Sequence, residues 1–441
     1  MRRFSAVSLI LALVVPILFL WNDASAVPAF ARKYHTACST CHLAFPVRNG
    51  FGEAFRNNGY RFPDSTDEEM VKEEPIKLGQ DSYKKIFPKA IWPSDLPNMP
   101  TLGFLARVGA STFKENGKFS NSRLDEELDI FFAGTVTNQI SYIGDFAVGP
   151  NGEPATLGRI TLLWTFKPGI TMAFGTVGFP ERFDIISTTA GPDDNGFAAQ
   201  MPNPNKGVEL RLAGAAGKNN SYFVVAGLGR NTQSDGAPVF TDGTGVATTY
   251  DANGSVNGGN FGDTKFVRAT FKIGGNGLLN GSGGVLGNQV IGMDQAITIG
   301  FNYLNSSDGA NAGFAEYLPG LSHTVYGGDI MATYGNARAI VQYTRFSEIL
   351  DNTGVDTGKR NALSVEGDYW IYPWLFGVVR YEHMKDSLNG EYTRLIPGIG
   401  ALLRPNFKVG VEYVNVSKLD NWTDPFYSPT NSWKLFTQLG F

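Results

Sequence analysis

Alternation of apolar and polar side chains is the dominant pattern from about residue 101 to the C-terminus. The side chains that share an apolar face are, in four separate stretches, Phe407, Val409, Val411 and Tyr413; Val267, Ala269, Phe271 and Ile273; Val208, Leu210 and Leu212; and Trp433, Leu435, Leu439 and Phe441. Charged and small residues such as Lys408, Glu412, Arg268 and Glu209 occupy the opposite face. A period of two predicts β-strands with one apolar and one polar face.

About 16 such segments follow one another, and the links between them alternate in length. Short links are expected near residues 137–138, 167–169, 217–218, 335–336, 372–373 and 405–406, and long links at Lys114–Arg123, Pro180–Asn205, Asn231–Asp263, Ser306–Leu321, Glu348–Gly358 and Asp420–Thr430. The link Gly275–Gly292 breaks the alternation, through either an insertion or a slipped register. Alternating loop lengths are typical of outer-membrane barrels and have no counterpart in a soluble β-sandwich.

Composition agrees with this fold class. The 441 residues include 53 glycines and 13% aromatic residues, and the mean hydropathy is close to neutral at −0.13. Strands that are apolar on one face only give this mixture, so the chain is predicted to be mainly β, with a transmembrane antiparallel barrel over residues 100–441. An even strand number would place both barrel ends on the periplasmic side, and the final Phe441 resembles the C-terminal signal of bacterial outer-membrane proteins.

The N-terminus has the pattern of a secretory signal peptide over residues 1–26. Arg2 and Arg3 precede the apolar run Leu9–Leu20, and Ala24-Ser25-Ala26 forms a small-residue cleavage site. The run is too short for a retained spanning helix. Removal of the signal peptide takes away Arg2, Arg3 and Asp23 and changes the formal net charge from −4 to −5. This charge gives no indication of nucleic-acid binding.

The only two cysteines lie in Cys38-Ser39-Thr40-Cys41-His42, at the start of a segment 27–99 that precedes the barrel. This spacing is typical of covalent c-type haem attachment: two thiols add to the two vinyl groups, and the adjacent histidine is the proximal iron ligand. One covalent haem c is therefore the predicted cofactor. A redox-active pair or half of a zinc site are the alternatives, but the first would need a βαβ context and the second two more ligands.

The second axial ligand is left open by the sequence. Met99, in the motif Pro97-Asn98-Met99-Pro100, is the first candidate, followed by Met70 and His35. A methionine would raise the reduction potential relative to a histidine. A five-coordinate iron is the further alternative.

A short helix is predicted over Asn49–Asn58, with Gly59 as its C-terminal stop. It would present Phe51 and Phe55 on one face, suited either to one wall of a haem crevice or to a small apolar core. A compact segment of roughly 70 residues has a radius of gyration near 11 Å, and a barrel of about 16 strands a backbone radius of ~16 Å. The haem domain is thus a candidate plug that enters the barrel from the periplasmic side.

The N-terminal motifs resemble those of the fused cytochrome–porin family, which includes the outer-membrane cytochrome c that oxidises extracellular Fe(II) in iron-oxidising bacteria. The resemblance is carried by Ala29-Phe30-Ala31-Arg32, Cys38-Ser39-Thr40-Cys41-His42, Phe45-Pro46, Phe51-Gly52, Phe55 and Gly59-Tyr60. It implies haem thioethers at Cys38 and Cys41 and a proximal bond from His42. Two stretches depart from that family's pattern: Lys33-Tyr34-His35 before the cysteines and Gly50-Phe51-Gly52-Glu53 after them.

The expected function is electron transfer across the bacterial outer membrane. Extracellular Fe(II), or another redox partner, would supply the electrons, and a periplasmic cytochrome or copper protein would accept them. The sequence leaves open whether the chain is an Fe(II) oxidase. Electron export to extracellular acceptors is one alternative. The other is a diffusion porin with a structural or sensory haem, in which lumen charges such as Arg107, Arg211, Arg268 and Lys272 would set selectivity.

Overall fold

The computed structural model describes part of the chain in detail. The described residues are 29–44, 47–62, 76–77, 95–96, 101–115, 118–137, 139–148, 156–177, 206–230, 262, 264–275, 277–278, 294–306, 321–350, 356–387, 390–404, 406–422 and 430–440. The predicted signal peptide, Met70 and Met99 lie outside these residues. No helix in the described ranges is long and apolar enough to cross a membrane.

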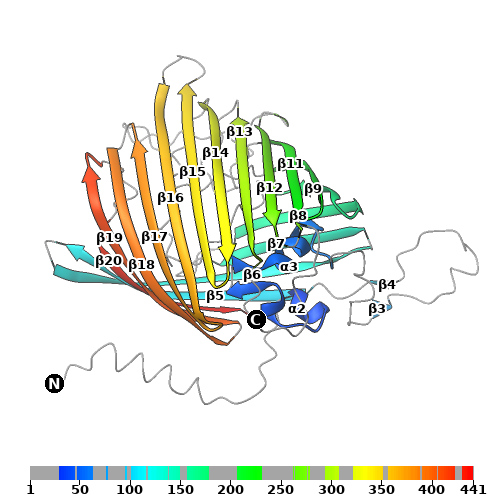
Figure 1. Cartoon of the computed structure of the whole chain (residues 1–441), viewed down its shortest axis with the longest axis horizontal. Helices are drawn as coiled ribbons and strands as arrows, with labels where there is room; N and C mark the ends of the chain where they lie inside the picture. The colour runs from blue at the N-terminus through cyan, green and yellow to red at the C-terminus, as the bar shows by residue number, and fades with distance from the viewer. Residues whose placement is uncertain are drawn as a thin grey trace, which may run out of the picture.

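Sixteen antiparallel strands, β5 to β20, form a closed barrel, which confirms the predicted fold class (Figure 1). Their bounds are β5 Thr101–Glu115, β6 Lys118–Thr135, β7 Ile140–Val148, β8 Thr156–Lys167, β9 Ile170–Gly175, β10 Lys206–Ala215, β11 Asn220–Arg230, β12 Thr264–Gly274, β13 Ala296–Ser306, β14 Leu321–Tyr334, β15 Ala337–Leu350, β16 Asp356–Tyr372, β17 Leu375–Asp386, β18 Gly390–Arg404, β19 Phe407–Asp420 and β20 Ser432–Gly440. Each strand pairs with its sequence neighbours, and β20 pairs with β5 to close the barrel. Because the strand number is even, the first and last strands begin and end at the same rim, where Leu105 pairs with Gly440.

The two faces of the wall differ as the alternation predicts. On β12, for example, Val267, Phe271 and Ile273 point away from the interior, whereas Arg268 and Lys272 are buried on the inner face. Large apolar side chains are exposed along the outer face, including Phe301, Val379, Leu395, Ile399 and Trp433. An apolar exterior around a polar interior is the arrangement that suits a barrel surrounded by lipid.

All six predicted short links are tight connections in the structure and lie at one rim, called here the short-turn rim. The long link between β12 and β13, residues 275–295, belongs to the same rim, so it is an insertion and the predicted register was correct. One prediction was wrong: Lys114–Arg123 is not a long loop, because β5 and β6 pair down to Glu115 and Lys118. Backbone hydrogen bonds continue the ladder there although the side chains are polar. The strands β15 and β16 are extended in the same way, which shortens the predicted link Glu348–Gly358 to residues 351–355.

Residues 29–62, called here the mouth segment, form several small elements before the barrel. They are α2 Ala29–Lys33, the 3-10 turn η1 Cys38–Thr40, the hairpin β1 His42–Ala44 and β2 Val47–Arg48, and α3 Gly50–Asn57. The predicted helix is confirmed as α3, whose N-cap is Asn49 and which is followed by Gly59 at φ +70. The short pair β3 Ile76–Lys77 and β4 Asp95–Leu96 follows. Figure 1 shows α2 and α3 at one rim of the barrel.

Candidate functional site

The predicted attachment motif forms a single tight turn. The backbone amide of Thr40 donates to the carbonyl of Ala37 at 3.0 Å, and that of Cys41 donates to the carbonyl of Cys38 at 3.2 Å. Residues three apart are eclipsed in 3-10 geometry, so Cys38 and Cys41 lie on the same side of the turn. Both are free cysteines of intermediate exposure, and His42 follows at the first position of β1, also partly exposed.

Burial raises the pKa of the Cys38 thiol, and it raises the pKa of the Cys41 thiol to about 12, with a further contribution from the charge of Cys38. Both groups are therefore thiols at neutral pH. A thioredoxin-like pair depends on a lowered thiol pKa, so this environment does not favour a redox-active pair. A zinc site also lacks support, because the described residues contain no group of three or more histidine, cysteine or acidic side chains.

An aromatic cluster lies against the turn. Tyr34, Phe51, Phe55 and Phe62 are buried together, and Phe30, Cys41 and Tyr60 pack against them. Tyr34 and Phe62 meet edge to face with ring centroids 4.8 Å apart, and Phe30 and Tyr60 are stacked at 5.5 Å. The two phenylalanines of α3 thus belong to a packed set of rings that touches Cys41.

Asn49 connects the turn to α3. Its side-chain nitrogen donates to the carbonyls of Ser39 at 3.2 Å and Thr40 at 2.9 Å, while its side-chain oxygen accepts from the amide of Gly52 at 2.9 Å. Its backbone amide donates to the carbonyl of Cys41 at 2.9 Å. Gly52 allows this approach because a Cβ at that position would overlap the carbonyl oxygen of Cys41.

The far end of the mouth segment is bound to the inner wall formed by β7, β8 and β9. The hydroxyl of Ser141 donates to the carbonyl of Gly59 at 2.6 Å, and Arg61 donates to the carbonyl of Thr137 at 2.5 Å. Tyr60 packs against a buried apolar cluster on the inner face that includes Leu163. The segment therefore makes polar and apolar contacts with this wall.

The hairpin that follows His42 contacts a different part of the wall. Ala44 and Val47 are buried with Trp370, Phe376 and Val378 of β16 and β17. In the closed strand order, β16 and β17 are far from β7 to β9, and α2 lies near β5 and β6. Contacts with several separate walls place the mouth segment across the short-turn rim of the lumen.

The long link between β12 and β13 also holds the segment. Asn57 donates to the carbonyl of Leu278 at 3.0 Å, and the amide of Leu278 in turn donates to the hydroxyl of Ser221 at 3.0 Å. Asp294, at the end of this link, is the nearest neighbour of Gly50 and forms an ion pair with Lys272. The only insertion at this rim is, within the described ranges, in direct contact with α3.

A small charged group joins α3 to β2. Glu53 forms ion pairs with Arg48 at 2.6 Å and with Arg56 at 3.5 Å. Burial by itself would raise the pKa of Glu53, but the two arginines, with a smaller contribution from Lys272, lower it to about 2. The carboxylate is therefore charged at any pH above about 3 and fixes the orientation of both guanidinium groups.

Buried ion pairs line the inner face of the wall from β12 to β18. Arg268 contacts Asp329 at 2.8 Å, Arg338 contacts Asp368 at 2.5 Å, and Arg394 pairs with Glu382. Each of these six side chains is at most 3% exposed. Opposite charges thus neutralise one another along the inner face of this part of the wall.

The structure places the other predicted residues as follows. Arg107, Arg211, Arg268 and Lys272 all lie on the inner face, and each pairs with a carboxylate: Asp129, Glu209, Asp329 and Asp294. His35, an alternative iron ligand, is exposed and has a positive φ of 48°. The candidates Met99 and Met70 lie outside the described residues.

Sequence reasoning missed one residue at the site and the full role of another. Trp370 is 1% exposed beside β1, and its indole nitrogen has no hydrogen-bond partner among the described residues. It lies at an inward position of β16 that should be polar, and an aromatic residue at such a position is the signal that could have identified it. The sequence predicts Asn49 only as the start of the helix, although an asparagine there is also a recognised N-cap signal.

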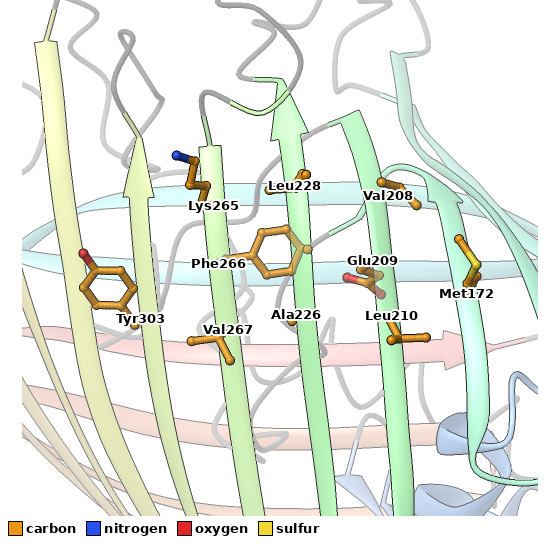
Figure 2. A pocket seen from close by; sticks show the side chains of 11 residues that line it. Met172, Val208, Glu209, Leu210, Ala226, Leu228, Lys265, Phe266, Val267 and Tyr303 are labelled. Atoms are coloured by element: carbon orange, nitrogen blue, oxygen red, sulfur yellow. The ribbon is translucent and has the colours of Figure 1, made fainter.

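A separate pocket of about 500 Å³ lies on the outer face of the wall, away from this site (Figure 2). Met172, Leu210, Leu228, Val267 and Tyr303 surround Ala226 there, on strands β9 to β13. The lining is almost entirely apolar, and Ala226 is smaller than its neighbours. The pocket is a dent in the apolar exterior, and its charged lining residues are Glu209, which is paired with Arg211, and Lys265.

The mouth segment fits covalent haem c on two observations. The two cysteines are free and eclipsed on one turn, with a histidine directly after them. The rings that touch Cys41 supply an apolar wall. Cys38, Cys41 and His42 are the residues that would hold the group, and it would supply a one-electron redox couple.

Comparison with known proteins supports the fold. OmpF of Salmonella typhi, in complex with daunomycin, has a TM-score of 0.50 and 12% identity, covering 77% of this chain and 97% of that chain. An anion-selective porin from Comamonas acidovorans has a TM-score of 0.48 and 10% identity, covering 77% and 99%. The outer-membrane channel DcaP of Acinetobacter baumannii has a TM-score of 0.46 and 12% identity, covering 77% and 96%. No family model and no curated protein matches the chain. At this identity the likeness concerns the fold alone, and that fold is a porin-like barrel of sixteen strands.

Proposed function

We propose that this chain is an outer-membrane c-type cytochrome in which the barrel carries a single haem at its periplasmic rim. The observation that carries the proposal is the position of Cys38, Cys41 and His42 on a turn that is bound across the lumen. Electrons would come from extracellular Fe(II) and leave to a periplasmic cytochrome or copper protein. Met99, Met70 or His35 would supply a sixth ligand if the iron has one.

The chain's own residues would hold and shield the cofactor. Cys38 and Cys41 would hold the haem through thioether bonds, and His42 would be its proximal ligand. The cluster of Tyr34, Phe51 and Phe55 would keep water from the haem, which would raise its reduction potential by disfavouring the more highly charged oxidised state. A haem held at the rim would be accessible to a periplasmic carrier, while the opposite side of the plug faces the lumen.

The test is an anaerobic visible spectrum of the purified protein, produced in a host with working cytochrome c maturation. Full reduction of the oxidised protein by Fe(II) supports iron oxidation. Reduction by dithionite alone would point instead to a low-potential haem and electron export. Absence of any haem spectrum, with wild-type protein folded, would overturn the proposal. Replacement of His42 by alanine should abolish reduction by Fe(II) without unfolding the barrel.

A diffusion porin with a structural or sensory haem is the second candidate, and the porin-like fold with a charged inner face favours it. The near-complete burial of those charges and the plug across the rim do not favour free diffusion. Solute flux into vesicles that contain the protein separates the two. Rapid flux of small solutes that is independent of the haem oxidation state would support the porin.

A further inference from the structure

The outer face of strands β15 to β18 changes its chemistry from one rim to the other. Near the short-turn rim Tyr369 is exposed, and the turn between β16 and β17 carries the stacked rings of Tyr372 and Trp374, with centroids 5.6 Å apart. Farther from this rim the exposed outward side chains are apolar or aromatic: Val341, Val379, Tyr381, Leu395 and Ile399. Exposed rings beside an apolar band are typical of an interface with lipid headgroups.

At the rim opposite the short-turn rim, called here the far rim, the same strands present cations. Cross-strand pairing places Arg345 of β15 opposite Asn361 of β16, and Asn361 opposite Lys385 of β17. Lys359 lies on the same face as Asn361, one step nearer the far rim. Lys359 and Lys385 are exposed, and Arg345 is partly exposed. These three basic residues, called here the basic patch, lie on the outer face of three adjacent strands (Figure 1).

The basic patch lies at the edge of the apolar band. The stretch of β16 from Lys359 to Tyr369 is about 34 Å long, which corresponds to about 26 Å across the membrane at a strand tilt near 40°. The apolar band of an outer-membrane barrel is about 25 Å tall. The rings at the short-turn rim and the basic patch at the far rim are therefore placed at the headgroup regions of opposite leaflets.

Carboxylates on this face do not neutralise the patch. Within the described residues, Arg345 lies over the ring of Tyr326, at 5.9 Å from its centroid, and has no carboxylate partner. Glu391 is directly opposite Lys385 in the strand register, but its carboxylate pairs with Lys418. Arg345 and Lys385 thus keep their positive charges beside the apolar exterior.

An amide donor lies between these two cations. The hydroxyl of Tyr343 donates to the side-chain oxygen of Asn361 at 2.9 Å, which leaves the side-chain nitrogen of Asn361 as a donor. Neighbouring strands are about 4.8 Å apart, so Arg345 and Lys385 start about 10 Å from each other on either side of this amide. Two long cationic side chains that flank an N–H group suit the oxygens of a phosphate.

We propose that the basic patch binds the phosphorylated headgroup of lipopolysaccharide, the glycolipid of the outer leaflet. The occupant has to be anionic at the headgroup and apolar next to it, because the cations stand at the edge of an apolar face. Inorganic phosphate meets only the first condition. The inference rests on the proposed function for its orientation, with the short-turn rim in the periplasm, and makes no use of the haem.

The experiment titrates purified full-length protein in detergent with lipid A, the phosphorylated anchor of that glycolipid, and counts bound lipid by native mass spectrometry. Arg345→Gln, Lys385→Gln and the double variant remove charge without adding bulk, and Arg345→Lys keeps it. The matched control is Lys265→Gln, which removes an exposed outward lysine at the far rim of β12, away from the patch. Altered gel mobility before heating verifies that each variant is folded.

Each lost cation should weaken binding of lipid A about fivefold, the order expected for a basic residue at an anionic lipid surface, and the double variant about 25-fold. Arg345→Lys and Lys265→Gln should bind within about twofold of the wild type. Lipid A without its phosphates should bind the wild type about as weakly as intact lipid A binds the double variant.

Equal loss in Lys265→Gln would overturn the proposal, because any cation on the outer face would then suffice. Phosphatidylglycerol that binds as tightly as lipid A, or inorganic phosphate that displaces lipid A at a similar concentration, would overturn the assignment to the glycolipid. Unchanged binding in the double variant would overturn the role of the patch itself. Failure of the proposed function gives a different result, in which folded wild-type protein carries no haem while its binding of lipid A is unaffected.

Discussion

The barrel wall and the mouth segment are stabilised in different ways. Each strand of the wall is joined to two neighbours by a continuous ladder of hydrogen bonds, so one side chain adds little that its neighbours do not also supply. The mouth segment has only two-residue to three-residue strands and short helices. Its position depends on single contacts, such as Ser141 to Gly59, Asn57 to Leu278 and Arg61 to Thr137. A repeated pattern thus builds the scaffold, and a few individual contacts place the site on it.

The link between β12 and β13 shows how the two regions meet. All other predicted turns at the short-turn rim are tight, but this one spans residues 275–295. Leu278 and Asp294, near its two ends, contact α3 through Asn57 and Gly50. We interpret the extra length as the part of the wall that receives the mouth segment.

The largest effect is expected from a charge on the outer face of the wall. Val379 lies in β17 and is 50% exposed on the apolar exterior. Val379→Arg should destabilise the folded barrel by about 2–4 kcal/mol, because a guanidinium would be placed against hydrocarbon. Urea unfolding in lipid vesicles measures this, and Val379→Thr is the uncharged control of similar size. Equal stability of the two variants would show that this face is not in contact with lipid.

A smaller difference in stability is expected between the alanine variants of two glycines with positive φ, one in each region. Gly59 of the mouth segment has φ +70, and a Cβ there would lie 2.6 Å from the Thr165 hydroxyl of the wall. Gly217, in the turn between β10 and β11, has φ +102 and nothing within 4 Å. Alanine costs about 1–2 kcal/mol for the backbone conformation at either site. Gly59→Ala should cost about 1–3 kcal/mol more, because the segment must move away from the wall.

Thermal unfolding of the two glycine variants, together with the rate of trypsin cleavage in the mouth segment, checks this. Gly59→Ala should accelerate cleavage, and Gly217→Ala should leave it unchanged. If both variants behave alike, the contact between Gly59 and Thr165 contributes nothing to the attachment of the segment.

Most of the barrel could be predicted from the sequence, because its physical cause is local. Alternation assigns each side chain to a face without knowledge of its partners, and so Arg268 and Lys272 were placed on the inner face correctly. The pattern failed at Lys114–Arg123, where a ladder continues without apolar side chains. Register and hydrogen bonding decide such ends, and neither is visible in a hydropathy pattern.

The site was predicted less completely, because its environment comes from distant parts of the chain. The spacing of Cys38, Cys41 and His42 is visible in the sequence, and the ring cluster was anticipated in part from Phe51 and Phe55. The contact between Ala44 and Trp370 joins residues more than 300 positions apart, and no local signal reports it. The hydrogen bonds from the Asn49 side chain to the carbonyls of Ser39 and Thr40 also have no local signal in the sequence. The N-cap preference of asparagine predicts only its bond to the amide of Gly52 in α3.

The smallest effect is expected from acid, which should weaken the mouth segment more than the wall. The ordinary pKa of a glutamate is 4.5, and that of Glu53 is lowered to about 2 by Arg48 and Arg56 against the opposing effect of burial. A carboxyl with a lowered pKa in the folded protein stabilises it above the ordinary pKa, and this contribution is lost as the pH falls from about 4.5 to about 2. The backbone hydrogen bonds of the wall contain no titrating group, although its inner face carries ion pairs, so acid should loosen the mouth segment while the backbone ladder keeps the barrel closed. Glu53→Gln should remove the pH dependence.

Pepsin cleavage after the rings of α3, measured from pH 4.5 to pH 2, distinguishes the outcomes. Wild-type protein should be more resistant than Glu53→Gln at pH 4.5, and the two rates should converge toward pH 2. Glu391→Gln removes a carboxylate from an exposed ion pair with Lys418 in the wall and serves as the matched control, with little change expected. A difference between wild type and Glu53→Gln that stays constant down to pH 2 would mean that the ion pairs of Glu53 do not hold α3 in the rim. The segment would then be held by its other contacts, such as those of Ser141, Asn57 and Arg61.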